Sequence, residues 1–270
     1  SRSENRNFSK RLQIVNYSKD IESWCEMLNN SDIIINLAGE PIVAKRWSKK
    51  QKRVILNSRL NSINQISKAL KIIGHRPQLI MNASAIGYYP HSSEKQDEHS
   101  KNGFHFSSQV CVEWENKAVK NLLSKTNRLV ILRFGIVLDR KSGILLKLFP
   151  FFRYGLGAVL GNGKQIFSWV DIDDIVESIK HIINSDIVGP VNIVAPSKDT
   201  NYAFSKILGK VLGRPVFIRI PAFILQLFLG EMSDSIVKGS NIYPSILLES
   251  GYKFRFVKLY DSVQKNYVKE

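Results

Sequence analysis

The run LVILRF, residues 129–134, is short, apolar and rich in branched side chains. Such a run is typical of a strand that is buried on both faces, as in a parallel sheet covered by helices. Four further runs share this character and occupy residues 12–17, 33–37, 79–84 and 191–195. We therefore expect a core of buried parallel strands.

Segments of helical period separate these runs. Residues 48–73 form the longest one, with Ser48 as its N-cap and an apolar stripe that comprises Val54, Ile55, Ile63, Ile66, Leu70 and Ile73. Further helices are expected at residues 20–28, 105–123 and 171–183. The buried side of the last comprises Ile172, Ile175, Val176, Ile179, Ile182 and Ile183. Alternating strands and helices predict an α/β fold, a doubly wound parallel sheet with right-handed crossovers.

The character of the chain changes after residue 196. We expect a helix at residues 201–212, a short strand at 216–220 and mostly helical apolar segments from there to the end. No linker rich in Pro, Gly or Ser precedes them, which favours a lobe packed on the sheet over an independent domain. The expected division is a sheet domain at residues 1–196 and a smaller, mostly helical lobe at residues 197–270.

Composition limits the classes of partner. The 270 residues are 44% hydrophobic and carry a formal charge of +16, yet no apolar run is long enough to span a bilayer, so we expect no membrane partner. The basic residues are spread along the chain without an arginine-rich or RNP-like motif. An A+T-biased coding sequence also produces abundant Lys, Ile and Asn. We therefore expect no nucleic-acid partner.

The cysteines and the first residue bear on the compartment. Cys25 and Cys111 are too few for a disulfide framework and are not spaced for zinc, which indicates a reducing compartment. The chain begins with Ser1, and no basic-then-apolar signal segment follows. We expect a processed or truncated chain of a soluble intracellular protein, in the cytosol or an organelle interior.

The stretch YGLGAVLGNG, residues 154–163, has nearly the glycine spacing of a dinucleotide phosphate loop. Such a loop follows a buried strand and opens a helix, whose N-terminus then faces the phosphates. Here Pro150 and charged residues interrupt the preceding segment, and the turn pair Asn162-Gly163 and the strand-like QIFSWV follow. We expect a tight surface loop instead.

Several stretches together carry a family resemblance. They are INLAGEPI (35–42), RWS (46–48), NSRL (57–60), NASAIGYY (82–89), LRFGIVL (132–138), GNGKQIFSWVDIDDIV (161–176), TNYAF (200–204) and LGEMSDSIVKGSNIYPSILLESGY (229–252). The chain resembles, over its whole length, the epimerase family within the extended and atypical short-chain dehydrogenase/reductases, a family formerly described as cell-division-inhibitor-like. The resemblance implies a Rossmann-type sheet domain that binds NADP.

The same resemblance implies an N-terminal difference. Family members begin with a strand, a T-G-G-T-G-F-I-G loop, a helix and a second strand that ends in Ser-Arg. Ser1 and Arg2 match that ending, so the chain is expected to lack the first strand, the phosphate loop and the first helix. Arg2 then stands where an arginine pairs with a ribose 2′-phosphate, which implies NADP rather than NAD.

The resemblance implies further cofactor-binding residues besides Ser1 and Arg2. Leu37 and Ala38 end a buried strand over which the adenosine side of the cofactor runs in this family. Arg59 matches the arginine of a serine-arginine pair on the long helix, although a charge on the surface of that helix is the alternative. Val137 is expected to contact the nicotinamide end through its backbone.

Catalysis is where the sequence departs from the wider superfamily. Active members place a Tyr-x-x-x-Lys pair on a helix and a Ser or Thr on the preceding strand. Ser84 fits that hydroxyl and is our candidate catalytic residue, but Phe106 and Val110 occupy the two positions of the pair. Two tyrosines could replace the acid or pack in the core, and Cys111 could be reactive or a buried helical thiol.

The remaining polar residues are expected to be structural. His91, His99, His105, Asp97 and Glu98 lack metal-ligand spacing and are expected on a loop surface, so we predict no metal site. The two tyrosines that could either replace the missing acid or pack in the core are Tyr88 and Tyr89. Asp171 and Asp173 are expected to cap a helix, whereas Phe167 and Trp169 are candidates to line a substrate cleft.

Two readings of the function follow. The first is an NADP-dependent oxidoreductase or nucleotide-sugar-epimerase-like enzyme with a small-molecule substrate that the sequence does not identify. The alternative is a catalytically silent NADP-binding sensor or scaffold, which the residues at the acid positions favour. A homodimer is a further expectation.

Overall fold

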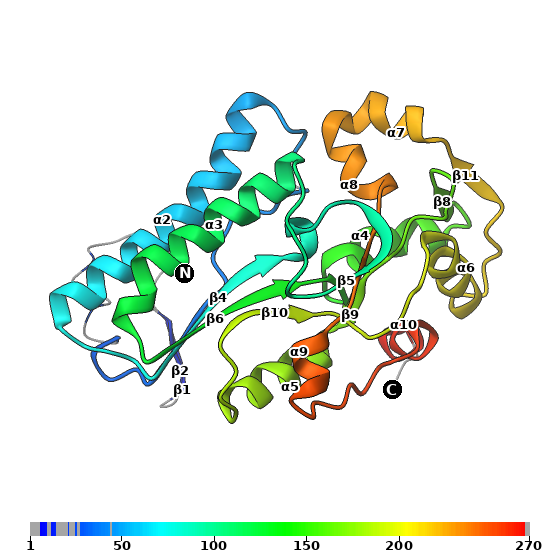
Figure 1. The fold of residues 1–270 in the computed structure, drawn as a ribbon. Coiled ribbons are helices and arrows are strands. Elements are labelled where there is room, and N and C mark those ends of the chain that lie inside the picture. Colours follow the sequence, from blue (N-terminus) through cyan, green and yellow to red (C-terminus); the bar gives the residue numbers. More distant parts are fainter. Residues whose placement is uncertain are drawn as a thin grey trace.

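A four-stranded parallel sheet forms the centre of the computed structural model, which describes residues 6–9, 12–14, 21, 25, 28–43 and 45–267 (Figure 1). Its strand order is β10-β6-β4-β3. The strands are β3 (Ile33–Asn36), β4 (Leu79–Ala85), β6 (Arg128–Phe134) and β10 (Gly189–Ile193). The predicted α/β class is confirmed, and four of the five apolar runs are strands of this sheet.

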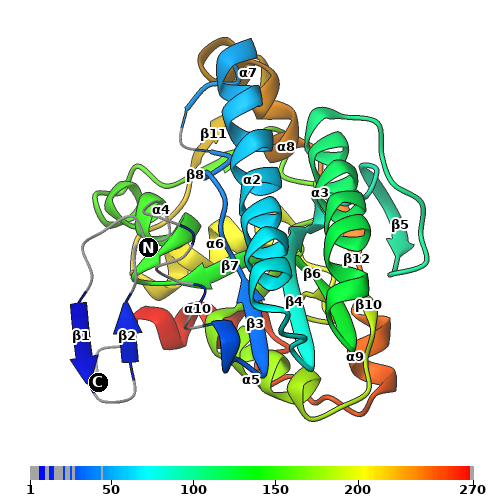
Figure 2. The same cartoon turned by 90° about the vertical axis from the view of Figure 1, so that its left-hand side faces the viewer.

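Helices cover both faces of the sheet (Figures 1 and 2). On one face lie α2 (Lys49–Ile73) and α3 (Phe106–Leu122), and on the other lie α5 (Ile172–Ile183) and α9 (Ser245–Glu249). The predicted cap of α2 is confirmed, because the Ser48 side chain accepts a hydrogen bond from the Gln51 backbone N–H. Two residues predicted to be buried, Val54 and Val176, are exposed because each lies one helical position beside the buried stripe.

The apolar run at residues 12–17 does not join the parallel sheet. Its described part, β2 (Leu12–Ile14), pairs antiparallel with β1 (Arg6–Ser9), so the prediction of a parallel strand is wrong there. Composition indicates a strand without fixing its partner, and a neighbour in sequence is the easiest partner to reach. Residues 15–17 lie outside the described residues, as does most of the predicted helix at 20–28, within which Cys25 and Leu28 are helical.

A second group of elements extends the fold beyond the main sheet. In it β7 (Ile136–Asp139) pairs with β9 (Trp169–Asp171), and β8 (Ala158–Leu160) pairs with β11 (Ile218–Ile220), both in parallel. Helix α4 (Gly143–Arg153) includes Pro150, so our expectation that this proline interrupts the segment is wrong. Proline removes only one backbone donor, and the burial of Leu145 and Phe152 holds the helix in place.

The glycine-rich stretch at residues 154–163 forms turns around β8, and no helix opens after it, as predicted. Gly155, Gly161 and Gly163 all have positive φ angles, which suit glycine in tight turns. This stretch is therefore no phosphate loop.

The C-terminal part of the chain contacts earlier elements at several places. The remaining elements are β5 (Ser92–Gln96), α6 (Asn201–Val211), α7 (Ala222–Leu229), α8 (Asp234–Val237), β12 (Ser240–Ile242), α10 (Leu259–Tyr267) and the 3-10 turns η1 (Ile86–Tyr88), η2 (Leu123–Lys125) and η3 (Gly230–Ser233). Strand β12 pairs with β5, and α9 packs beside β10. Among the described residues, no helix is both long and apolar enough to cross a bilayer.

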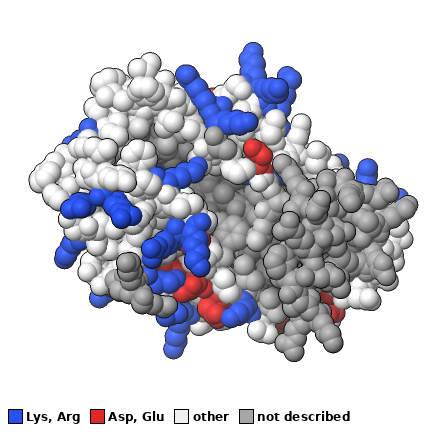
Figure 3. Space-filling model, turned by 180° about the vertical axis from the view of Figure 1, so that it is seen from behind, with Lys and Arg blue, Asp and Glu red and all other residues white. Residues whose placement is uncertain are grey.

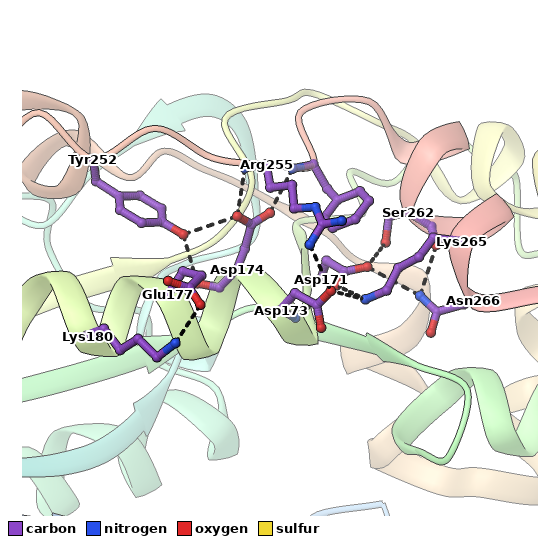
Figure 4. Close-up of polar contacts among 11 residues, drawn as sticks. Asp171, Asp173, Asp174, Glu177, Lys180, Tyr252, Arg255, Ser262, Lys265 and Asn266 are labelled. Atoms are coloured by element: carbon purple, nitrogen blue, oxygen red, sulfur yellow. Dashed lines mark hydrogen bonds and ion pairs between the residues drawn. The ribbon is translucent and has the colours of Figure 1, made fainter. Parts of the chain in front are cut away.

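The acidic N-terminus of α5 is bonded to the C-terminal segment of the chain (Figure 4). Asp171 caps α5 by accepting from the Asp173 backbone N–H at 2.9 Å. Its carboxylate also accepts hydrogen bonds from three side chains of α10, at 2.6 to 3.3 Å: Ser262, Lys265 and Asn266. Asp174 accepts from the Tyr252 hydroxyl at 3.1 Å and from two backbone N–H groups of the last loop, those of residues 255 and 256. Both carboxylates thus stabilise the packing of the C-terminal segment.

Candidate functional site

The carboxyl ends of the parallel strands form the candidate site. Ligands of doubly wound α/β proteins bind outside this edge, where the loops after each strand begin. In Figure 1 the arrowheads of β4, β6 and β10 point toward the side of the molecule where α4, α7 and α8 lie. The residues of interest therefore follow β3, β4 and β6.

The end of β3 is fixed by an amide network. The Asn36 side-chain amide donates to Asn82 Oδ1 at 2.7 Å and to Ser62 Oγ at 3.2 Å, and its own Oδ1 accepts from the Ala38 backbone N–H at 3.3 Å. The bonds to Asn82 and Ser62 hold the strand end to β4 and α2, and the bond from Ala38 shapes the turn that follows. Leu37 leaves the strand with 59% of its surface exposed, so it is available to a ligand.

The loop after β3 is held against the middle of α2. The Glu40 backbone N–H donates to Ser58 Oγ at 2.9 Å, and Arg59 Nη1 donates to the carbonyls of Glu40 and Ile55 at 3.0 and 2.9 Å. The Arg59 guanidinium lies 4.8 Å from the ring centre of Trp114. Burial lowers the pKa of Arg59 from its ordinary value. Arg59 is half-buried, and its role as a cofactor contact stays a prediction.

An open groove of about 700 Å³ lies along α2. It is lined by Lys49, Lys50, Arg53, Val54, Asn57, Ser58 and Asn61. The three basic residues form no ion pair with any described residue. Ser58 belongs both to this groove and to the contact with the β3 loop. The groove thus offers positive charge and polar side chains beside the sheet edge.

Sequence reasoning missed this basic row. Lys49, Lys50 and Arg53 follow the Ser48 cap at spacings that place them on adjacent parts of the first helical turns. That spacing was the available signal, but a cluster of cations at the start of a helix opposes the macrodipole and is easily dismissed as a solvated surface.

Ser84 lies at the end of β4 and is 3% exposed. Its hydroxyl donates to Glu115 Oε1 at 2.6 Å. Glu115 in turn accepts from Arg133 Nε at 2.9 Å and Nη2 at 2.7 Å, which makes a bidentate ion pair between α3 and β6. The Ser84 oxygen is thereby placed by a buried carboxylate, and the catalytic role of Ser84 stays a prediction.

The ion pair continues into a buried polar chain. Arg133 Nη1 donates to the Tyr89 hydroxyl at 2.8 Å, and that hydroxyl donates to Asn192 Oδ1 at 2.7 Å. The Arg133 guanidinium also lies 3.6 Å from the ring centre of Tyr88. Burial raises the pKa of Tyr89 to about 12. Tyr89 is therefore a core residue whose hydroxyl is already engaged, which answers for Tyr89 the question left open by the sequence.

The two positions of the superfamily's acid pair hold packed apolar side chains. Phe106 begins α3, and its ring lies edge-on to Trp47 with 4.8 Å between ring centres, while Lys52 Nζ lies 4.7 Å from its centre. Val110 is 3% exposed. Burial raises the pKa of the neighbouring Cys111 thiol to about 12. Among these residues, none has the properties of a proton donor near neutral pH.

A histidine pair lies where β5 and α3 begin. The rings of His91 and His105 stack with 4.3 Å between their centres, and His105 Nδ1 accepts from the Ser108 backbone N–H to cap α3. Burial lowers the pKa of His91 to about 4. The expected surface location is wrong for Glu98, which is buried and accepts from the Asn192 backbone N–H at 2.9 Å. The inward position of Glu98 provides an acceptor for the buried backbone N–H of Asn192.

The remaining residues predicted from the sequence have different outcomes in the structure. Val137 lies half-buried in β7, paired with Val170 of β9, and its contact with a nicotinamide stays a prediction. Phe167 and Trp169 do not line a cleft, because both are buried in the core around α4 and α6, so this expectation is wrong. Ser1 and Arg2 lie outside the described residues.

Comparisons with known proteins bear on this geometry. Residues 220–264 match the family described as "Domain of unknown function (DUF1731)". The chain is 33% identical over 265 residues to the epimerase family protein SH2119 of Staphylococcus haemolyticus, covering 96% of this chain and 86% of that relative. It is 34% identical over 247 residues to the epimerase family protein SDR39U1 of Mus musculus, covering 88% and 84%.

Solved structures agree with these relatives. A crystal structure of the human epimerase family protein SDR39U1 (isoform 2) with NADPH has a TM-score of 0.82 and 30% identity, covering 89% of this chain and 85% of that one. UDP-glucuronic acid 4-epimerase from Bacillus cereus, in complex with NAD, has a TM-score of 0.74 at 17% identity, covering 96% and 81%, and shows the fold alone. The chain therefore belongs to the epimerase family of atypical short-chain dehydrogenase/reductases.

Proposed function

We propose that this protein binds NADP(H) at the carboxyl edge of its sheet and uses it as an oxidoreductase on a small carbonyl or nucleotide-sugar substrate. The observation that carries the proposal is the groove beside the β3 end, which is lined by the cations Lys49, Lys50 and Arg53. A relative of 30% identity that is crystallised with NADPH supports the choice of cofactor.

The residues at this edge fit the parts of a dinucleotide phosphate. Phosphates require cations or backbone donors, which the basic row of α2 supplies, and Leu37 offers exposed apolar surface to an adenine ring. Ser1 and Arg2 are proposed to bind the 2′-phosphate side, and Val137 the nicotinamide side. When bound, NADPH would supply a hydride to the substrate.

The chain's own part in such a reaction centres on Ser84. Its hydroxyl donates to Glu115 and also contacts the Cys111 thiol, so a ligand would use the remaining lone pair of its oxygen. The Glu115–Arg133 ion pair fixes this orientation within a buried cluster. We propose that Ser84 orients the substrate carbonyl and that the proton added to its oxygen comes from solvent.

A second candidate function is a nucleotide sensor without turnover. It is favoured by one observation, the packing of Phe106 and Val110 where the superfamily places its proton donor and that donor's partner. The sensor would share the cofactor groove and differ only in that bound NADPH is never consumed.

Calorimetric titration tests the binding step. We expect NADPH to bind at least about tenfold more tightly than NADH, because one further phosphate meets one further cation. Arg53→Ala should weaken NADPH binding, whereas the control Lys71→Ala, at the far end of the same helix, should not. Equal affinities for the two nucleotides, or no loss in Arg53→Ala, would contradict the proposed groove.

Turnover separates the two candidates. NADPH absorbance is followed with panels of small carbonyl compounds and nucleotide sugars, for the unmodified chain and for Ser84→Ala. Consumption that Ser84→Ala abolishes while NADPH affinity is unchanged supports the oxidoreductase. Tight binding without consumption of NADPH by any compound supports the sensor.

A further inference from the structure

Helix α7 is apolar on every side yet buries none of its residues. Its sequence, AFILQLFL, contains a single polar side chain, Gln226. Phe223, Leu227 and Phe228 are 68%, 69% and 72% exposed. A helix without a polar face is normally enclosed by protein or by lipid. In the described structure α7 packs chiefly on the following turn, η3, and lies at the outer margin of the fold (Figure 1).

The exposed apolar surface extends to the strand that precedes α7. Phe217 is 86% exposed and Ile218 is also exposed, so five large apolar side chains face outward within residues 217–228. We call this stretch the apolar segment. Apolar patches of this kind on a soluble protein mark a surface that binds a partner or a membrane.

The chain before and within the apolar segment is basic. Residues 201–230 contain no acidic side chain, and their basic residues are Lys206, Lys210, Arg214 and Arg219. The acidic residues that follow, Glu231 and Asp234, are each paired with a lysine. The view from behind shows a largely uncharged surface where α7 lies, at the upper left, with blue side chains beside it (Figure 3).

The charge pattern selects among the occupants of this surface. A second copy of the chain would bring the same unpaired cations against each other, and the whole chain carries a formal charge of +16. Apolar side chains together with Lys and Arg are the combination that binds the interface of an anionic bilayer. The eight residues of α7 correspond to about 12 Å of helix, which suits a shallow position among the headgroups.

We propose that the apolar segment docks onto an anionic lipid surface. Phe223, Leu227 and Phe228 enter the headgroup region, while Arg214 and Arg219 meet lipid phosphates. The sequence-based expectation of no membrane partner considered only spanning helices, and docking by α7 requires none.

Vesicle flotation with the full chain tests the proposal. The probes are vesicles of phosphatidylcholine alone and of phosphatidylcholine mixed with phosphatidylglycerol. We expect the protein to float with the mixed vesicles, and the double variant Phe223→Ser/Leu227→Ser to bind them at least about tenfold more weakly. The control, Ile72→Ser/Val188→Ser, removes two exposed apolar residues elsewhere and should bind like the unmodified chain.

Charge and depth are measured separately. Arg214→Glu/Arg219→Glu should also weaken flotation about tenfold or more, whereas Lys71→Glu should have little effect. A Phe228→Trp variant reports insertion through a blue shift of its fluorescence with mixed vesicles but not with phosphatidylcholine alone. Because all of these side chains are exposed, circular dichroism should show an unchanged fold.

Three results would overturn the proposal. One is absence of flotation with mixed vesicles. Another is flotation that the Phe223→Ser/Leu227→Ser variant retains in full, since the net charge alone would then explain it. The last is a dimer in light scattering that the same variant dissociates, which would assign the apolar segment to a second copy of the chain.

Discussion

Removal of the Asp174 carboxylate should strongly destabilise the protein. This side chain is 1% exposed and accepts from the Tyr252 hydroxyl at 3.1 Å and from the backbone N–H groups of Arg255 and Phe256 at 2.8 and 2.9 Å. In Asp174→Ala these donors lose their acceptor inside the protein. A buried polar group without a partner costs free energy, and hydrogen bonds to charged groups are the strongest of their kind.

The expected magnitude follows from that count. Each hydrogen bond to a charged group contributes about 1.5–3 kcal/mol, so three independent ones would contribute about 4.5–9 kcal/mol. Bonds that share one acceptor are not additive, and water enters the space left behind, so we expect a loss of about 3–5 kcal/mol. With a urea slope of about 3 kcal/mol/M, the midpoint of unfolding falls by about 1–1.7 M.

Urea unfolding followed by circular dichroism measures this change. Asp174→Asn keeps one acceptor oxygen but presents an amide N–H₂ to a backbone donor, so it should lose about half as much. The control is Asp186→Ala, an exposed carboxylate, which should stay within about 0.5 kcal/mol of the unmodified chain. If Asp174→Ala loses less than about 1 kcal/mol, the argument that this carboxylate anchors the C-terminal segment is wrong.

Three further predictions concern buried titratable groups. The folded-state pKa of His91 is lowered to about 4, so its contribution to stability is present above about pH 6.5 and is lost as pH falls toward 4; His91→Gln should flatten this part of a pH–stability curve. The Cys111 thiol, with its pKa raised to about 12, should resist a disulfide reagent in folded Cys25→Ser protein and react at once in urea; labelling in the folded state would contradict its burial. Glu115→Gln leaves a buried guanidinium without its counter-ion and should cost about 3–5 kcal/mol in thermal or urea unfolding, against little change for exposed Glu113→Gln.

The central sheet could be predicted because its strands are apolar on both faces. Strands β3, β4, β6 and β10 all appear in the sequence as short apolar runs, and both long helices next to them show a clear period. The features predicted wrongly include the pairing partner of β2 and the effect of a proline on α4. Strand β2 found a local antiparallel partner, and α4 tolerates Pro150 because tertiary packing outweighs a lost backbone hydrogen bond.

The candidate site was only partly predictable for a related reason. Ser84 and Leu37 could be placed from the family pattern at strand ends. Glu115 and Arg133 could not be paired from sequence, because they lie 18 residues apart on different elements and meet only when α3 packs on β6. A charged residue inside the apolar run LVILRF was the one visible sign that such a partner exists.

The carboxylates at the start of α5 also constrain the order in which contacts form while the chain is synthesised. Their partners in the last loop and α10 follow 78 to 95 residues later in the chain. At about 5–20 residues per second, a ribosome needs roughly 4–20 s to make that stretch. During this interval Asp171 and Asp174 remain hydrated, and the corner of the sheet beside them stays open. The contacts of these two carboxylates with residues 252–266 therefore form only after that segment has left the ribosome.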